Sequence, residues 1–195
     1  MSDAKHEEAP VQATAQAIDA APPLDGERLT RLFDEHRQKI YRAAYRITGN
    51  ASDAEDVLQT VFLRLLRLDR GAHLGEHPGR YLHLSAVNGA LDLIRARGGG
   101  RMTPLEDVEP VLTDQASDPG QAFDSQVLAG RVRDAMSRLS PNAARAFALR
   151  YLEGCDNAEI ARALGTSRAV VAVLLHRARA RVQRALRTPP EGDLS

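Results

Sequence analysis

The sequence predicts an all-α protein in which two helical domains are joined by a flexible acidic linker. Abundant Ala, Leu and Arg favour helices, while four Phe, four Tyr and no Trp leave few of the aromatic residues that favour strands. Apolar residues recur at spacings of three and four residues on both sides of residues 98–124. That segment lacks the period and is rich in Gly, Pro and acidic residues, which is typical of a linker.

The first helical domain is expected over residues 25–97. It follows an N-terminal extension, residues 1–24, whose Ala, Gln, Pro and acidic residues predict disorder. The first helix is amphipathic, runs from Leu24 to Thr48 and ends at a Gly-Asn pair.

The second helix is expected to begin with a capping box formed by Ser52 and Glu55. Apolar residues occupy one of its faces: Val57, Leu58, Val61, Phe62, Leu65 and Leu66. Leu63 falls near the opposite face, which is polar and carries Asp53, Asp56, Gln59, Thr60 and Arg64.

A loop then leads to a third helix from about Gly79 to Arg97. The loop holds His73 and His77, but no Cys and no helical context accompany them, so we expect no metal site. The third helix carries Asn88 and Asp92 four residues apart, close enough to pair along one face.

The second helical domain is expected over residues 125–187, before a tail at residues 188–195. Its helix boundaries carry local signals in order: Ser140 capping a helix that begins at Pro141, a capping box of Asp156 and Glu159, a left-handed helix end at Gly165, and Ser167 capping the last helix. This order is the outline of a helix-turn-helix, whose second element normally enters the DNA major groove.

The formal net charge of zero conceals a marked segregation of charge. Residues 126–187 carry twelve Arg against four acidic residues, which gives +8, whereas residues 98–125 carry one Arg against six, which gives −5. A basic module of this kind suggests a polyanionic partner.

Several classes of protein are disfavoured. A single cysteine, Cys155, excludes an internal disulfide framework and a Cys-rich zinc site. No Gly-rich phosphate loop, HExxH or GxSxG motif is present, so we expect no catalytic residues and no cofactor. No apolar run approaches a membrane span and the N-terminus lacks a signal-peptide pattern, so we expect a soluble cytoplasmic protein without membrane insertion.

Three motifs resemble one known family. The segment DAEDVLQTVFLRL, from Asp53 to Leu65, resembles the DAEDLVQEVFLRL signature of the extracytoplasmic-function (ECF) bacterial sigma factors. The segment from Tyr81 to Arg95 resembles the WL-x-RIA-x-N-x-ALD-x-IR pattern of the same family, with Tyr, Leu and Ser in place of its Trp, Arg and Ile. The helix-turn-helix, through Leu175-His176-Arg177-Ala178-Arg179, resembles the fourth region of these proteins.

The resemblance implies a transcription initiation factor with partners rather than substrates. Region two would bind the β′ clamp of the RNA polymerase core, with the β flap as a further contact of the polymerase. The positions that match the polymerase-binding motif are Asp53, Asp56, Gln59, Leu63 and Arg64. A polar helix face by itself would more often indicate only solvent exposure.

Promoter DNA is the second implied partner, and an anti-sigma factor is a possible third. Region two would melt the minus-ten element and hold single-stranded bases, with Asn88 at the base-reading position and Arg95 and Arg97 contacting phosphates. Region four would read the minus-thirty-five element. The candidate DNA-binding residues there are Ser167, Arg168, Ala169, Ala172, Val173, His176, Arg177 and Arg179.

The recognition helix departs from the family because residues 169–175 carry no charge. Apolar side chains can touch a thymine methyl but supply no bidentate hydrogen bonds. Two interpretations stay open: DNA reading is weak and depends on Arg168, His176 and Arg177, or an exposed Val173-Leu174 patch binds a protein.

The sequence therefore predicts a non-enzymatic sigma factor that recruits RNA polymerase core and opens promoter DNA. One alternative is a sigma-like regulator whose fourth region binds a protein partner. Another is a helix-turn-helix regulator of DNA that does not recruit polymerase, and the motif at residues 53–65 argues against it.

Overall fold

The computed structural model describes residues 26–67, 77–97 and 119–187. Every regular element within these ranges is a helix: α1 (Gly26–Thr48), α2 (Ala51–Arg67), α3 (Pro78–Ala96), α4 (Pro119–Ser137), α5 (Pro141–Tyr151), α6 (Asn157–Leu164) and α7 (Arg168–Arg187). The all-α prediction is confirmed. The predicted disordered extension and tail, and most of the predicted flexible linker, lie outside the described residues.

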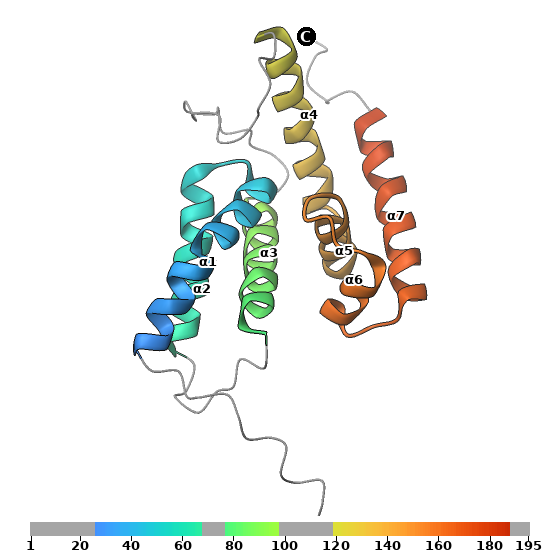
Figure 1. Ribbon diagram of the computed structural model, residues 1–195. Helices are drawn as coiled ribbons and strands as arrows, with labels where there is room; N and C mark the ends of the chain where they lie inside the picture. Colours follow the sequence, from blue (N-terminus) through green and yellow to red (C-terminus); the bar gives the residue numbers. More distant parts are fainter. Residues whose placement is uncertain (1–25, 68–76, 98–118, 188–195) are drawn as a thin grey trace, which may run out of the picture.

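Helices α1, α2 and α3 pack against one another and form the first unit (Figure 1). Their buried faces follow the three- and four-residue spacing of the sequence, with Ile40, Ile47, Leu65, Leu82 and Leu91 almost fully buried. Close packing of these side chains fixes how α2 and α3 lie, and hence which of their residues face outward.

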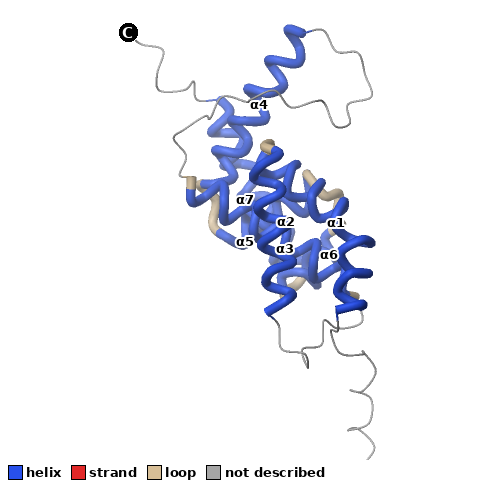
Figure 2. Tube along the Cα trace, turned by 90° about the vertical axis from the view of Figure 1, so that its left-hand side faces the viewer, coloured by secondary structure: helices blue, strands red, loops and turns tan. Residues whose placement is uncertain are grey.

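Helices α4 to α7 form the second unit. Helix α7 packs against α4, α5 and α6, and Met136, Ile160 and Val171 are fully buried among them. Figure 2 shows the second unit from the side, with α4 extending away from the rest of the bundle. Helix α4 begins at Pro119, within the segment predicted as linker, because proline suits the first position of a helix.

The predicted helix-turn-helix boundaries are present in α5 to α7, but the Ser140 side chain makes no capping hydrogen bond at the start of α5. Pro141 is the first residue of α5, Asp156 and Glu159 form a complete capping box on α6, and Gly165 ends α6 in the left-handed conformation at φ +62°. The Ser167 hydroxyl accepts a hydrogen bond from the Val170 amide at 3.3 Å, which caps α7.

The predicted capping box of α2 is wrong. Helix α2 begins at Ala51, and the Asn50 side-chain oxygen accepts a hydrogen bond from the Asp53 amide at 3.0 Å. Gly49, with φ +66°, turns the chain directly before Asn50, so Asn50 rather than Ser52 occupies the capping position.

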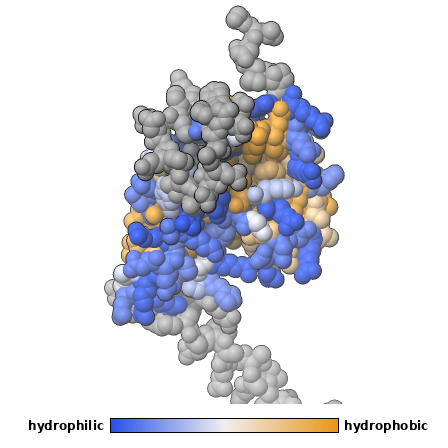
Figure 3. All heavy atoms as spheres, turned by 45° about the horizontal axis from the view of Figure 1, so that its top comes forward, coloured by the Kyte–Doolittle hydropathy of each residue, from blue (hydrophilic) through white to orange (hydrophobic). Residues whose placement is uncertain are grey.

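Hydrophilic and apolar side chains occupy separate areas on one face of the molecule. In Figure 3, which brings forward the end of the molecule where α4 begins and α7 ends, apolar side chains gather beside a hydrophilic band. No helix in the described ranges combines the length and apolar character needed to cross a membrane.

Candidate polymerase-binding and nucleic-acid interfaces

The outward face of α2 combines charged side chains with exposed leucines. Asp56, Gln59 and Arg64 are exposed, and between them Leu63 is 48% exposed. Leu66, predicted on the buried face, is 60% exposed instead. Solvation explains the polar residues on such a face but not two exposed leucines three positions apart, so this face has the composition of a docking surface.

A shallow groove between α2 and α3 adjoins this face of α2. Asp56, Thr60 and Arg64 line it from α2, while Ser85 and Asp92 line it from α3. A partner that contacts α2 can therefore also reach the outward side of α3.

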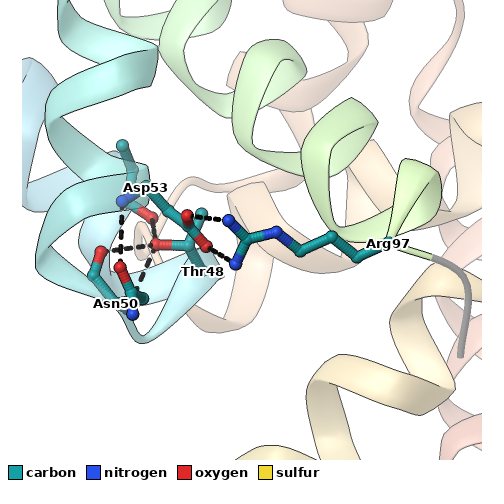
Figure 4. A network of polar contacts seen from close by, with 5 residues as sticks. Thr48, Asn50, Asp53 and Arg97 are labelled. Atoms are coloured by element: carbon teal, nitrogen blue, oxygen red, sulfur yellow. Dashed lines mark hydrogen bonds and ion pairs between the residues drawn. The ribbon is translucent and has the colours of Figure 1, made fainter. Parts of the chain in front are cut away.

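Asp53 does not lie on the polar face of α2 as predicted. Its side chain is 4% exposed, and both terminal nitrogens of Arg97 donate to its carboxylate. Asn50 and Thr48 complete the network, which ties the end of α3 to the connection between α1 and α2 (Figure 4). Burial raises the pKa of the Asp53 carboxyl, and the Arg97 guanidinium offsets part of that rise.

This pair bears on the predictions for both residues. The Asp53 carboxylate faces into the first unit, so it is not presented to a partner on the surface of α2. The Arg97 guanidinium is paired with Asp53, but its side chain is 52% exposed, so its contact with a phosphate stays a prediction. Periodicity along α2 could not reveal this contact, because Arg97 lies 44 positions further along the chain.

Two candidate DNA-binding residues of α3 carry polar atoms without partners. Asn88 Oδ1 and Arg95 Nε and Nη2 are buried, and no described residue forms a hydrogen bond with them. Asp92, the alternative partner considered for Asn88, accepts a hydrogen bond from Arg95 Nη1 at 3.2 Å. Unpaired buried polar groups cost about 1–3 kcal/mol each, and native proteins keep few of them without a functional reason.

Helix α7 presents the predicted DNA-binding face to solvent. Val171, Leu175, Ala178 and Val182 point into the core. The candidate residues all lie on the exposed side: Ser167, Arg168, Ala169, Ala172, Val173, His176, Arg177 and Arg179. Leu174 is half-buried and packs against the core, so the exposed apolar patch is smaller than the predicted Val173-Leu174 pair.

A contact between the two units involves residues that sequence reasoning missed. Glu153 lies in the connection after α5, and its side chain is only 3% exposed. Arg46 of α1 donates to both carboxylate oxygens, at 2.9 and 2.8 Å, and His83 of α3 lies 2.6 Å from Oε2. Arg80 adds a hydrogen bond to the Glu159 carbonyl at 3.2 Å.

The environment of Glu153 keeps it ionised. Burial raises the pKa of the Glu153 carboxyl, but hydrogen bonds from His83 and Arg46, together with their charges, outweigh burial and lower the pKa overall. Sequence alone gave no signal for this site, since its partners lie 107 and 70 positions away.

Models of two protein-family regions match this chain, and both regions belong to the same class of protein. Residues 32–99 match the model of sigma-70 region 2, and residues 129–182 match the model of sigma-70 region 4. The first match spans most of α1 together with α2 and α3, and the second spans α5, α6 and most of α7.

Curated relatives of this chain are also sigma factors. The ECF RNA polymerase sigma factor SigE of Mycolicibacterium smegmatis is 34% identical over 149 residues, which cover 76% of this chain and 57% of SigE. This chain therefore spans little more than half the length of that relative. The ECF sigma factor SigM of Mycobacterium tuberculosis is 30% identical over 182 residues, which cover 90% of this chain and 85% of SigM.

Among solved structures, the sigma factor RpoE of Bartonella quintana, in complex with the anti-sigma factor NepR, superposes with a TM-score of 0.50. The match covers 83% of this chain and 98% of RpoE at 18% sequence identity, so it shows a shared fold. Together with the identity to SigM over most of both chains, the two matched regions show that this chain belongs to the ECF family of RNA polymerase sigma factors.

Proposed function

We propose that this protein binds the RNA polymerase core and directs it to promoters, which it recognises through regions 2 and 4. It acts by binding and by capturing single-stranded bases, and it supplies no catalytic chemistry, in keeping with a family that is non-enzymatic. Since RNA polymerase works in the cytoplasm, we place the protein there.

The exposed face of α2 is the main observation that supports this proposal. Leu63, beside Asp56, Gln59 and Arg64, offers an apolar anchor with a polar surround, which is the composition of many protein interfaces. The same four positions match the polymerase-binding motif of the family. Asp53 is left out because its carboxylate is buried against Arg97.

Promoter opening is assigned to α3 of region 2. Asn88 can donate and accept hydrogen bonds, and its buried Oδ1 has no donor among the described residues. Arg95 lies seven positions further, on the same face of the helix, and holds two unpaired buried nitrogens. A base edge can supply the hydrogen bond that Asn88 lacks, and a phosphate can accept the hydrogen bonds that Arg95 has free to donate.

Recognition of duplex DNA is assigned to α7 of region 4. It is the second helix of a helix-turn-helix and carries six Arg and no acidic residue. Regulation by an anti-sigma factor is a further proposal, which rests on family membership alone.

The test is binding of the full-length chain to purified core polymerase, measured by competition with a labelled sigma factor. Leu63→Ser should weaken binding at least tenfold without changing stability, because the side chain is already half in solvent. Leu128→Ser is the matched control, since Leu128 is 52% exposed on α4, away from the proposed interface.

The opposite pattern would support the alternative of a DNA-binding regulator that does not recruit polymerase. In that case the unmodified chain would bind DNA but not core polymerase, and Leu63→Ser would behave like Leu128→Ser.

A further inference from the structure

We propose that α7 recognises a thymine-rich minus-thirty-five element through contacts between small apolar side chains and thymine methyl groups. Val173 and its exposed alanine neighbours Ala169 and Ala172 are the specificity-determining residues. This inference rests on the proposed function, because it requires region 4 to enter the major groove of promoter DNA.

The face of α7 that points away from the protein is defined by the helical period. The buried residues Val171, Leu175, Ala178 and Val182 follow spacings of four, three and four. A set displaced by two positions, which is a turn of about 200°, has the same spacings and faces outward. Its members are exposed: Ala169, Val173, His176 and Ala180.

Arginines border this outward face on both sides. Arg177 follows His176 on one side, Arg179 precedes Ala180 on the other, and both are exposed. Helix α7 contains six Arg and no acidic residue, so its charge is complementary to the phosphates that border a DNA groove. Cations at the border and small side chains at the centre match the cross-section of a major groove, with phosphates outside and base edges inside.

Apart from His176, the centre of the face can distinguish bases only through shape and apolar contact. Val173 is 49% exposed and, being β-branched, holds its methyl groups in few orientations. Neither it nor the two alanines can donate to guanine or form a bidentate pair with adenine. The C5-methyl of thymine is the apolar group that the major groove offers, so thymine is the base that these side chains favour.

The same face is poorly suited to docking a protein. Protein interfaces depend on large anchors, mainly Trp, Tyr and Arg seated in pockets, with charged residues depleted from the centre. The centre of this face offers one Val, small alanines and His176, and the nearby Leu174 is half-buried against the core. The observations therefore favour duplex DNA.

The experiment replaces thymine by deoxyuridine, which lacks only the C5-methyl group. Holoenzyme reconstituted with core polymerase first selects promoters from a randomised duplex library. Each thymine of the selected minus-thirty-five element is then replaced in turn, and holoenzyme affinity is measured by competition. Loss of one buried methyl should weaken binding roughly fourfold per position.

Val173→Ala should abolish the deoxyuridine effect at one or more positions, because the methyl group then has no contact to lose. Val170→Ala is the matched control: Val170 is 47% exposed on the same helix but lies off the central face, so the deoxyuridine effect should persist.

Three outcomes would overturn the inference while the proposed function stands: selected elements without thymine opposite α7, deoxyuridine with no effect at any position, or an effect that Val173→Ala leaves intact. In the last case, wild-type promoter opening by Val173→Ala would favour a protein partner for this face. Failure of the holoenzyme to select or open any promoter would instead reject the proposed function, and the inference with it.

Discussion

Replacing Glu153 with glutamine removes a negative charge that three nitrogens approach within hydrogen-bonding distance. These nitrogens are Arg46 Nε and Nη2 and His83 Nε2, and they belong to the other helical unit. Removing one partner of a buried ion pair lowers the free energy of unfolding by about 3–5 kcal/mol, because the remaining charge stays desolvated. The Arg46 side chain is 45% exposed, so water can hydrate its charge in the variant and the loss is smaller. We therefore expect Glu153→Gln to lower the free energy of unfolding by about 1–3 kcal/mol.

The loss should depend on pH with a defined sign. The pKa of Glu153 is lower in the folded protein than in the unfolded chain, so its contribution is complete above the unfolded value, about 4.3. The contribution is lost as the pH falls through the folded pKa. The stability difference between wild type and Glu153→Gln should therefore shrink as the pH drops below about 4.

Urea unfolding followed by circular dichroism measures both effects. Glu27→Gln is the control, because Glu27 pairs with Arg31 at 3.7 Å on an exposed face and the change should stay within about 0.5 kcal/mol. A Glu153→Gln change as mild as this control, or a stability deficit that does not diminish in acid, would contradict the stabilising role of the Glu153 ion pairs.

Two further predictions concern region 4. Gly165→Ala should destabilise the protein by about 1 kcal/mol in the same urea assay: φ is +62° and the added methyl would meet no atom within 4 Å, so the cost comes from the left-handed backbone alone. Unchanged stability would contradict it. Arg179→Gln should reduce the slope of log affinity against log salt concentration for promoter DNA by about 1, because one phosphate contact is lost. A slope equal to that of the wild type would show that Arg179 faces only solvent.

Features determined by neighbouring residues could be predicted from the sequence. The capping box of Asp156 and Glu159 joins residues three positions apart, and the left-handed end at Gly165 depends on a single residue type. The buried face of α7 follows from the spacing of Val171, Leu175 and Ala178.

Features that depend on distant contacts could not be predicted. Asp53 reads as polar and therefore exposed, and only the folded position of Arg97 explains its burial. The cap of α2 was misplaced because Asn50 and Ser52 are both good capping residues, and the turn at Gly49 decides between them.

Side-chain periodicity along α7 also has a limit. It identifies the centre of each face, but Leu174 lies at the border, and its half-buried position depends on how α7 packs in the bundle.

The most direct test of sigma activity is promoter opening by reconstituted holoenzyme. The purified chain is combined with core polymerase and a promoter library, and unpaired thymines are detected by permanganate reactivity over a range of salt concentrations. We expect that a limited set of duplexes opens near the minus-ten position only when this chain is present, and that Leu63→Ser reduces opening at limiting concentrations of the chain. If no duplex opens at any salt concentration although the core is active with another sigma factor, this chain does not act as a sigma factor.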